Sequence, residues 1–275
     1  MDTIKFIALD LDGTLTDSSK HITPRTLQAL YAAQEQGVKL IIASGRPPKG
    51  IAPIAQELRL ASRGGYIMAY NGGEVSRAMD GALLYRCCLP SEALGEVCAW
   101  SRRLGLPLVT HADGNILTNA PFNDHVVRNA AINGMPVVGS DALEQTLQRL
   151  PQPPVKFLMV GEAGPLAEAE RLLQSAFAGR LEVCRSTPNF MEIVAAGIDK
   201  SGALKRILQV EDASPAQLMA FGDGDNDLGM IRYAGMGIAM ANATPRLREA
   251  ARFVTLDNDS DGIAHALDIF YFRQE

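Results

Sequence analysis

The first third of the chain alternates short apolar runs with segments whose apolar residues recur at helical spacing. Apolar runs of strand length occupy residues 5–9, 38–43 and 66–69. Residues 23–37 predict a helix, because Thr23 and Pro24 form a start signal and Gly37 a stop signal, and residues 49–58 predict a second helix. Strands that alternate with helices in this way predict a parallel sheet with right-handed crossovers.

The middle of the chain, residues 84–186, has a different pattern. Short strand candidates occur among helix candidates, which is typical of an α+β unit whose antiparallel sheet has one covered face. The strands are expected at residues 106–110, 115–118, 155–160 and 181–185, and the helices at 91–104, 123–132, 141–150 and 165–177. We therefore expect this segment to be an inserted unit.

Beyond residue 186 the alternation of strands and helices returns. A strand is expected at residues 191–195, a helix at 200–209 and a strand at 218–221, and further elements alternate up to a last helix from Gly262. We predict an α/β fold, with a doubly wound parallel-sheet core of Rossmann type. Residues 1–83 and 187–275 would form this core domain, and residues 84–186 the inserted α+β domain.

Composition and charge narrow the range of partners. The 275 residues are 47% hydrophobic and carry a net charge of −5 without a large basic cluster, so a nucleic-acid partner is not expected. The four cysteines form no CxxC pair and fit a reducing compartment. We find no signal peptide and no apolar run of membrane-spanning length. We expect a soluble cytoplasmic protein, a monomer or small homo-oligomer, with no membrane partner.

The first strand ends in two crowded carboxylates, Asp10 and Asp12, with Gly13 directly after them. The carboxyl edge of a parallel sheet is where α/β proteins place their ligands. Two acids at this spacing repel each other unless a cation, a phosphoryl group or a shared proton lies between them. By itself the pair fits a capped turn equally well.

A second acidic loop follows the strand at residues 218–221. Asp223, Asp225 and Asp227, together with Asn226, offer the oxygen ligands that a hard divalent cation such as Mg²⁺ prefers. A solvated acidic turn is the alternative. A calcium-binding EF-hand loop is a poor match, because no twelve-residue ligand pattern ending in Glu is present.

Two further residues could bind an anion. Ser44 ends the second predicted strand and offers a hydroxyl group beside backbone N–H groups, although it could equally be a helix N-cap. Lys200 stands in the first turn of a predicted helix, where a cation is mildly unfavourable unless an anion is near. Taken alone, Lys200 would be read as a solvated surface lysine.

In combination these elements resemble the haloacid dehalogenase (HAD) superfamily, and within it the Cof-type sugar phosphatases. The resemblance runs essentially end to end, and the inserted unit falls where that branch carries its large α+β (C2-type) cap. It rests on four motifs in order, namely Asp10-Leu11-Asp12-Gly13-Thr14, Ser44-Gly45-Arg46, Lys200, and Gly222-Asp223-Gly224-Asp225-Asn226-Asp227.

The resemblance implies a Mg²⁺-dependent phosphatase with an aspartyl-phosphate intermediate. Asp10 would be the nucleophile and Asp12 the general acid and base. Mg²⁺ would be held by the Asp10 side chain, the backbone carbonyl of Asp12, and Asp223. Asp227 would not bind the metal itself but would orient either the metal's water ligands or Lys200.

The same resemblance implies that Ser44, Lys200 and Asn226 contact the phosphoryl group. It leaves the roles of Arg46 and Asp225 undecided.

The substrate would be a small phosphorylated metabolite, with sugar phosphates the leading class and phosphorylated cofactors such as pyridoxal phosphate or flavin mononucleotide also possible. Two other functions stay open at this point. One is a phosphomutase of the same superfamily, and the other is a non-catalytic phosphate-binding or receiver-like signalling protein.

Overall fold

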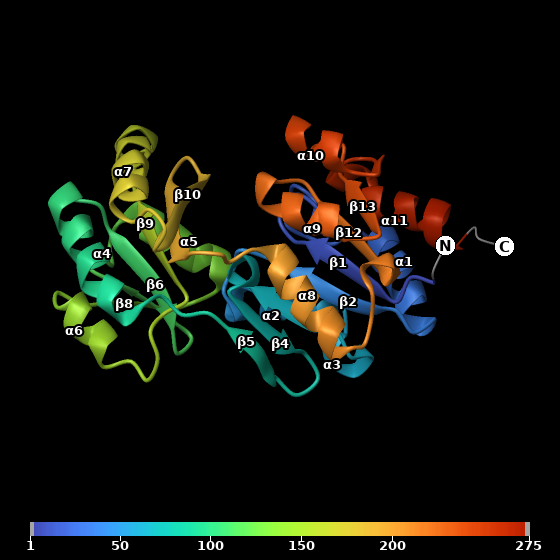
Figure 1. The fold of residues 1–275 in the computed structure, drawn as a ribbon, viewed down its shortest axis with the longest axis horizontal. Coiled ribbons are helices and arrows are strands. Elements are labelled where there is room, and N and C mark those ends of the chain that lie inside the picture. Colours follow the sequence, from blue (N-terminus) through green and yellow to red (C-terminus); the bar gives the residue numbers. More distant parts are fainter. Residues whose placement is uncertain (1–2, 273–275) are drawn as a thin grey trace. The chain divides into compact units, whose positions relative to one another are not determined.

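The protein is described here by a computed structural model that covers residues 3–272, and these residues form two compact units. One unit comprises the chain up to Tyr85 and again from Asp199 onward, and the other is the continuous segment Arg86–Ile198 (Figure 1). The second unit is thus an insertion in the sequence of the first.

The first unit is built on an eight-stranded sheet with the order β14-β13-β12-β1-β2-β3-β4-β5. Its pairs from β14 to β3 are parallel, and β4 runs antiparallel to β3. The strands are β1 (Phe6–Asp10), β2 (Lys39–Ala43), β3 (Tyr66–Ala69), β4 (Glu74–Arg77), β5 (Leu83–Arg86), β12 (Leu218–Gly222), β13 (Met236–Ala239) and β14 (Phe253–Val254).

Helices connect these strands on both faces of the sheet. The helices are α1 (Pro24–Glu35), α2 (Pro48–Glu57), α3 (Leu60–Arg63), α8 (Lys200–Val210), α9 (Leu228–Tyr233), α10 (Pro245–Ala250) and α11 (Gly262–Leu267). From β1 the chain moves through α1 to β2 on one side, whereas from β12 it moves through α9 to β13 on the other. Right-handed crossovers in opposite directions place α1 and α9 on opposite faces, so the sheet is doubly wound as predicted.

The central strand β1 is buried along its whole length. Phe6 and Ala8 pack in one core with Leu204 of α8, and the alternate residues Ile7 and Leu9 are fully buried outside that core. In Figure 1, α8 and α9 lie side by side in front of this sheet. Because the strand order reverses between β1 and β12, their carboxyl ends lie at the topological switch point, where such sheets bind ligands.

The second unit contains a six-stranded sheet with the order β10-β11-β9-β6-β7-β8, antiparallel except for the β7–β8 pair. Leu108, Phe157 and Met191 on one face of this sheet share a core with Val97 of α4 and Leu166 of α7. The elements are β6 (Leu108–Ala112), β7 (Asn115–Thr118), β8 (Val137–Gly139), β9 (Lys156–Val160), β10 (Leu181–Thr187), β11 (Phe190–Ala195), α4 (Ser91–Leu104), α5 (Asp124–Asn133), α6 (Leu143–Gln148) and α7 (Ala163–Ala176).

One boundary differs from the prediction from sequence. We assigned residues 187–198 to the core domain, but β11 pairs with β10 and β9, so this strand belongs to the sheet of the second unit. A fully buried apolar strand reads the same in either sheet, and its pairing partner decides the unit. The short strands β4, β5 and β8 had no recognisable pattern and were not predicted.

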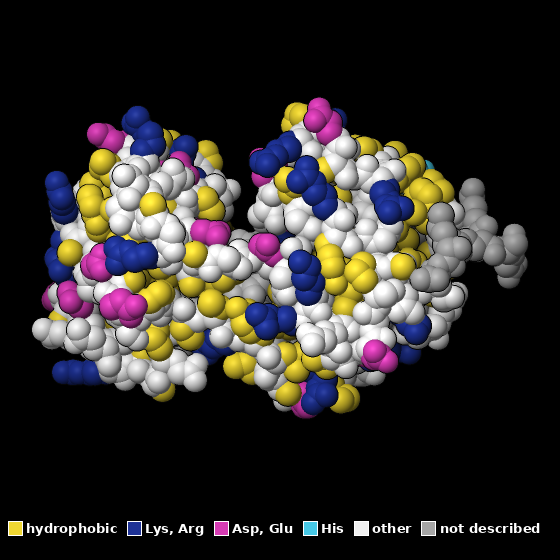
Figure 2. All heavy atoms as spheres, in the orientation of Figure 1, with side chains coloured by type: hydrophobic (Ala, Val, Ile, Leu, Met, Phe, Trp, Pro, Cys, Tyr) yellow, Lys and Arg dark blue, Asp and Glu magenta, His cyan; other side chains and the backbone are white. Residues whose placement is uncertain are grey.

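On the face drawn in Figure 2, basic and acidic side chains are interspersed on both units. Within residues 3–272, no helix has the length and apolar character needed to cross a membrane. The four cysteines are free thiols.

Candidate active site

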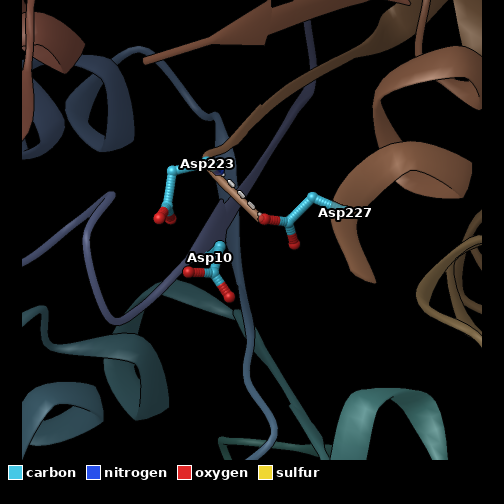
Figure 3. Close-up of side chains that lie close together, drawn as sticks. All are labelled: Asp10, Asp223 and Asp227. Atoms are coloured by element: carbon cyan, nitrogen blue, oxygen red, sulfur yellow. Dashed lines mark hydrogen bonds between the residues drawn. The ribbon is translucent and has the colours of Figure 1, made fainter. Parts of the chain in front are cut away.

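Three carboxylates converge at the carboxyl edge of the central strands. Asp10 is the last residue of β1, Asp223 follows β12, and Asp227 ends the short 3₁₀ turn Asp225–Asp227. Each offers an oxygen, and these oxygens lie within 4.8 Å of one another. Figure 3 shows the three side chains reaching into the same small space. Among the described residues this is the only such group of three or more potential metal ligands.

Lys200, the first residue of α8, joins two of these carboxylates. Its Nζ donates to Oδ1 of Asp10 at 2.5 Å and to Oδ1 of Asp227 at 2.6 Å, and its side chain has no exposed surface. The alternative of a solvated lysine is therefore wrong. Burial alone would lower the pKa of Lys200, but the charges of Asp10 and Asp227 more than offset this effect and raise the pKa above its ordinary value.

Asp227 is held from two sides. Its Oδ1 accepts the bond from Lys200, and its Oδ2 accepts hydrogen bonds at 3.0 Å from the backbone N–H groups of Asp223 and Gly224. Figure 3 shows the bond from Asp223. Both of its oxygens are thereby engaged by protein donors, and the side chain is completely buried. Asp227 therefore joins the acidic loop to Lys200.

The carboxylate cluster carries more negative than positive charge, and burial and mutual repulsion raise the pKa values of its carboxyl groups. The pKa of Asp10 lies well above its usual value because the carboxyl is buried and faces Asp227 and Asp223, and Lys200 offsets only part of this. Burial likewise raises the pKa of Asp223, against a hydrogen bond from Thr14 at 2.6 Å. Three carboxylates share one ammonium group, so a cation would stabilise all of them.

Gly13 is required where the first loop passes the acidic loop. Its φ of +88° favours glycine, and a Cβ at this position would lie 2.6 Å from Oδ2 of Asp223. The absence of a side chain keeps the space next to this oxygen open.

Asp12 lies outside the carboxylate cluster. Its two oxygens accept hydrogen bonds from Arg46, at 2.8 Å from Nε and 2.6 Å from Nη2, and one of them also accepts from Lys20 at 2.9 Å. Burial would raise the pKa of Asp12, but these cations bring it below its ordinary value. The role of Arg46 was undecided from sequence, and nothing in the sequence pointed to Lys20.

Ser44 directly follows β2 and is buried. Its Oγ accepts a hydrogen bond from the backbone N–H of Arg46 at 3.1 Å. Helix α2 begins at Pro48 with Pro47 at its N-cap, so the alternative that Ser44 is an N-cap is wrong. The side chain instead belongs to the turn at the strand end, beside Arg46.

Asn226 and Asp225 stand on the exposed part of the acidic loop. The Nδ2 group of Asn226 donates to Oδ1 of Asn71 at 3.1 Å, and Oδ1 of Asp225 accepts from Thr244 at 2.7 Å. Asn71 comes from the turn after β3, so Asn226 ties the acidic loop to a third strand end.

Comparison with known proteins decides the family. Residues 7–267 match the haloacid dehalogenase-like hydrolase family. The chain belongs to this family. It is 31% identical over 264 residues to the "Putative phosphatase YxeH" of Bacillus subtilis (strain 168), a match that covers 96% of this chain and 97% of that protein.

Two solved structures of HAD-like proteins share both units' folds. A haloacid dehalogenase-like hydrolase from Bacteroides thetaiotaomicron superposes with a TM-score of 0.92 at 39% identity, over 98% of this chain and 100% of that one. The HAD subclass IIB sugar phosphatase BT4131 gives a TM-score of 0.82 at 26% identity, over 97% of this chain and 98% of that one. The HAD-like fold and the resemblance to the Cof-type branch are thus confirmed.

Proposed function

We propose that this HAD-like hydrolase is a divalent-metal-dependent phosphatase that hydrolyses phosphomonoesters of small metabolites through a phosphoaspartate. The observation that carries the proposal is the buried cluster of Asp10, Asp223 and Asp227 with Lys200 at the carboxyl ends of β1 and β12. This arrangement supports phosphoryl transfer, because it offers a nucleophile, a cation site and a fixed positive charge in one space.

Asp10 is the proposed nucleophile. One of its carboxylate oxygens attacks the phosphorus, the bond from phosphorus to the ester oxygen breaks, and an aspartyl phosphate forms. The hydrogen bond from Lys200 at 2.5 Å fixes the carboxylate at the end of the rigid strand β1. A nucleophile held on a strand loses little entropy when it reaches the phosphorus.

Asp12 is the proposed general acid and base. Its carboxylic acid form gives a proton to the leaving oxygen, which departs as an alcohol. Its carboxylate then takes a proton from the water that attacks the aspartyl phosphate, and inorganic phosphate and free Asp10 result. Asp12 lies two residues after Asp10, on the loop that follows β1, and its pairing with Arg46 and Lys20 supports a separate role from the carboxylate cluster.

The carboxylate cluster fits a hard divalent cation, and we propose Mg²⁺. Asp10 and Asp223 would hold it, with the backbone carbonyl of Asp12 as a further ligand. The fit rests on the excess of carboxylate over ammonium charge and on the open space that Gly13 leaves beside Asp223. When bound, the cation neutralises the phosphate and so lets one anion approach another.

Ser44, Lys200 and Asn226 are the proposed phosphate-binding residues. Lys200 is the strongest of the three, because its buried ammonium already touches the nucleophile. Arg46 adds a second positive charge beside Ser44.

We propose that sugar phosphates are the leading substrate class, since one structural neighbour is a sugar phosphatase. A phosphate-releasing enzyme for small metabolites also agrees with the expected cytoplasmic location, which the four free thiols favour.

The test is a phosphate-release assay over a panel of phosphorylated sugars and cofactors with Mg²⁺, run beside Asp10→Asn. We expect the wild type to release inorganic phosphate and Asp10→Asn to lose the activity. Isomerised sugar phosphate without phosphate release would instead identify a mutase. No turnover of any kind would contradict the proposal and favour a phosphate-binding protein.

A further inference from the structure

The loop that carries Asp12 is bound on its outer side by two asparagines from distant parts of the chain. The Nδ2 group of Asn242 donates to the backbone carbonyl of Gly13 at 2.8 Å, and that of Asn258 donates to the carbonyl of Thr16 at 2.9 Å. Gly13 is the neighbour of Asp12, and Thr16 is bridged to Asp12 in a short β-type contact. Each asparagine therefore binds a backbone carbonyl of a residue that adjoins Asp12, either in the chain (Gly13) or through the bridge (Thr16).

The two asparagines are also joined to each other. The backbone N–H of Asn258 donates to Oδ1 of Asn242 at 3.2 Å. Asn242 thus uses both ends of its amide, one toward Gly13 and one toward Asn258. A further contact strengthens this attachment, because Asp259 accepts hydrogen bonds from the N–H and the hydroxyl of Ser18, at 2.7 and 2.6 Å.

The loop borders a cavity on this side. An open cavity of about 470 Å³ lies there, lined by Gly13, Ser18 and Lys20 from the loop and by Asn242 and Asn258 opposite. Its lining is polar, so apolar packing does not fix the loop where the cavity lies. The loop is held there by polar contacts, among them the hydrogen bonds from Asn242 and Asn258 to its backbone carbonyls.

We propose that Asn242 and Asn258 are positioning residues for Asp12. They touch neither the reacting atoms nor the carboxylate cluster, and they act through the backbone of Gly13 and Thr16. On the inner side the loop is already fixed by its own bonds, from Thr16 to the carbonyl of Leu11 and from Leu15 to that of Asp10. On the cavity side, the two asparagines restrain the loop together with the bonds between Ser18 and Asp259. This inference rests on the proposed function, in which Asp12 moves the proton.

The proposal implies a selective defect. A displaced Asp12 protonates the leaving oxygen poorly, and an alkyl ester needs that proton much more than an aryl ester whose phenolate leaves readily. Displacement by about 1 Å costs on the order of a hundredfold in an unfavourable case. The nucleophile on β1 is held independently by Lys200, so the placement of Asp10 is not affected and the defect falls on protonation of the leaving oxygen.

The test uses Asn242→Asp and Asn258→Asp, which keep the size and the acceptor oxygen, replace the Nδ2 donor and add a negative charge. Both variants are compared with wild type on p-nitrophenyl phosphate and on the best alkyl phosphate of the panel, with Mg²⁺ present. We expect kcat/KM, which reports formation of the aspartyl phosphate, to fall about tenfold on the alkyl phosphate and less than about threefold on the aryl phosphate. Because the two residues share one loop, the double variant should lose less than the product of the single losses.

Tyr31→Phe is the matched control, since it removes one side-chain hydrogen bond to a backbone carbonyl, that of Glu57, in the same unit. We expect it to leave both substrates within about twofold of wild type. Asn242→Ala and Asn258→Ala remove the donor without adding a charge and should show the same selective loss, and thermal unfolding verifies that each protein is folded. Equal losses of kcat/KM on the two substrates, or no loss, would overturn the proposal. A wild type that releases phosphate from neither substrate would overturn the proposed function itself.

Discussion

Arg46 donates two parallel hydrogen bonds to the carboxylate of Asp12, at 2.8 Å from Nε to Oδ2 and at 2.6 Å from Nη2 to Oδ1. The side chain of Arg46 is 17% exposed and that of Asp12 39%, so the pair is partly shielded from water. A planar fork fixes the plane of the carboxylate as well as its place. The two residues come from the ends of neighbouring strands, β1 and β2.

Replacing Arg46 should therefore lower turnover by releasing Asp12. Arg46→Ala removes the fork and the charge, and we expect kcat for an alkyl phosphate to fall about a hundredfold. Arg46→Lys keeps the charge but cannot form two parallel bonds, so it should recover only part of the loss. Steady-state phosphate release measures both.

Arg25→Ala is a suitable control for this comparison, because Arg25 forms an exposed ion pair with Asp268 in the same unit. Its kcat should stay close to that of wild type. If Arg46→Ala keeps wild-type turnover as well, then Arg46 does not orient Asp12.

Loss of Lys200 should harm stability as well as activity. Lys200→Met keeps the length of the side chain but leaves the buried carboxylates of Asp10 and Asp227 without their shared cation. We expect unfolding free energy to fall by about 3–5 kcal/mol and phosphate release to disappear. Urea unfolding of the variant beside wild type measures the first effect, and an unchanged midpoint would contradict it.

Divalent cations should stabilise the folded protein through the carboxylate cluster. A ligand at a hundred times its dissociation constant adds about 2.7 kcal/mol to the unfolding free energy, so saturating Mg²⁺ should raise the melting temperature and a chelator should reverse the rise. Asp223→Asn removes one proposed ligand, and we expect the shift to vanish or shrink strongly. An equal shift in wild type and variant would place the metal elsewhere.

Acid should weaken the second unit through His111. Burial and the charge of Lys156 lower the pKa of His111 from 6.5 to about 3, against a hydrogen bond with Asn129, and Lys156 itself pairs with Glu192 at 3.0 Å. The unfolded chain takes up a proton near pH 6.5 and the folded chain does not, so stability is complete above about pH 6.5 and declines toward pH 3.

His111→Gln removes this difference in proton uptake. We expect its unfolding free energy to depend less steeply on pH in that range than that of wild type, in urea titrations at several pH values. Parallel pH profiles for the two proteins would show that another group causes the acid sensitivity.

Much of the fold could be predicted from local signals. Thr23 caps α1 and Pro24 opens it as the sequence indicated, and the acids of β1 and of the loop after β12 meet at one sheet edge. Pairing between distant strands could not be predicted, since β11 reads as a buried strand in any sheet.

A contact between two side chains could be predicted only where both residues belong to the recognised motifs. The pairing of Lys200 with Asp227 was among the expected arrangements. The contact of Asp12 with Lys20 was not, because Lys20 belongs to no motif and reaches Asp12 only through the path of an exposed loop. The attachment of that loop by Asn242 and Asn258 likewise depends on contacts between the two ends of the chain.

The most direct test of the central claim is to detect the phosphoryl group on Asp10. Wild-type protein is mixed with the best phosphomonoester and Mg²⁺, quenched in acid within the first turnover, digested, and examined by mass spectrometry. We predict a phosphorylated peptide whose modification lies at Asp10, formed and lost at rates that account for phosphate release, and absent from Asp10→Asn. Three results would contradict the account: phosphate release without a phosphorylated peptide, a phosphoryl group on a residue other than Asp10, or undiminished phosphate release in Asp10→Asn.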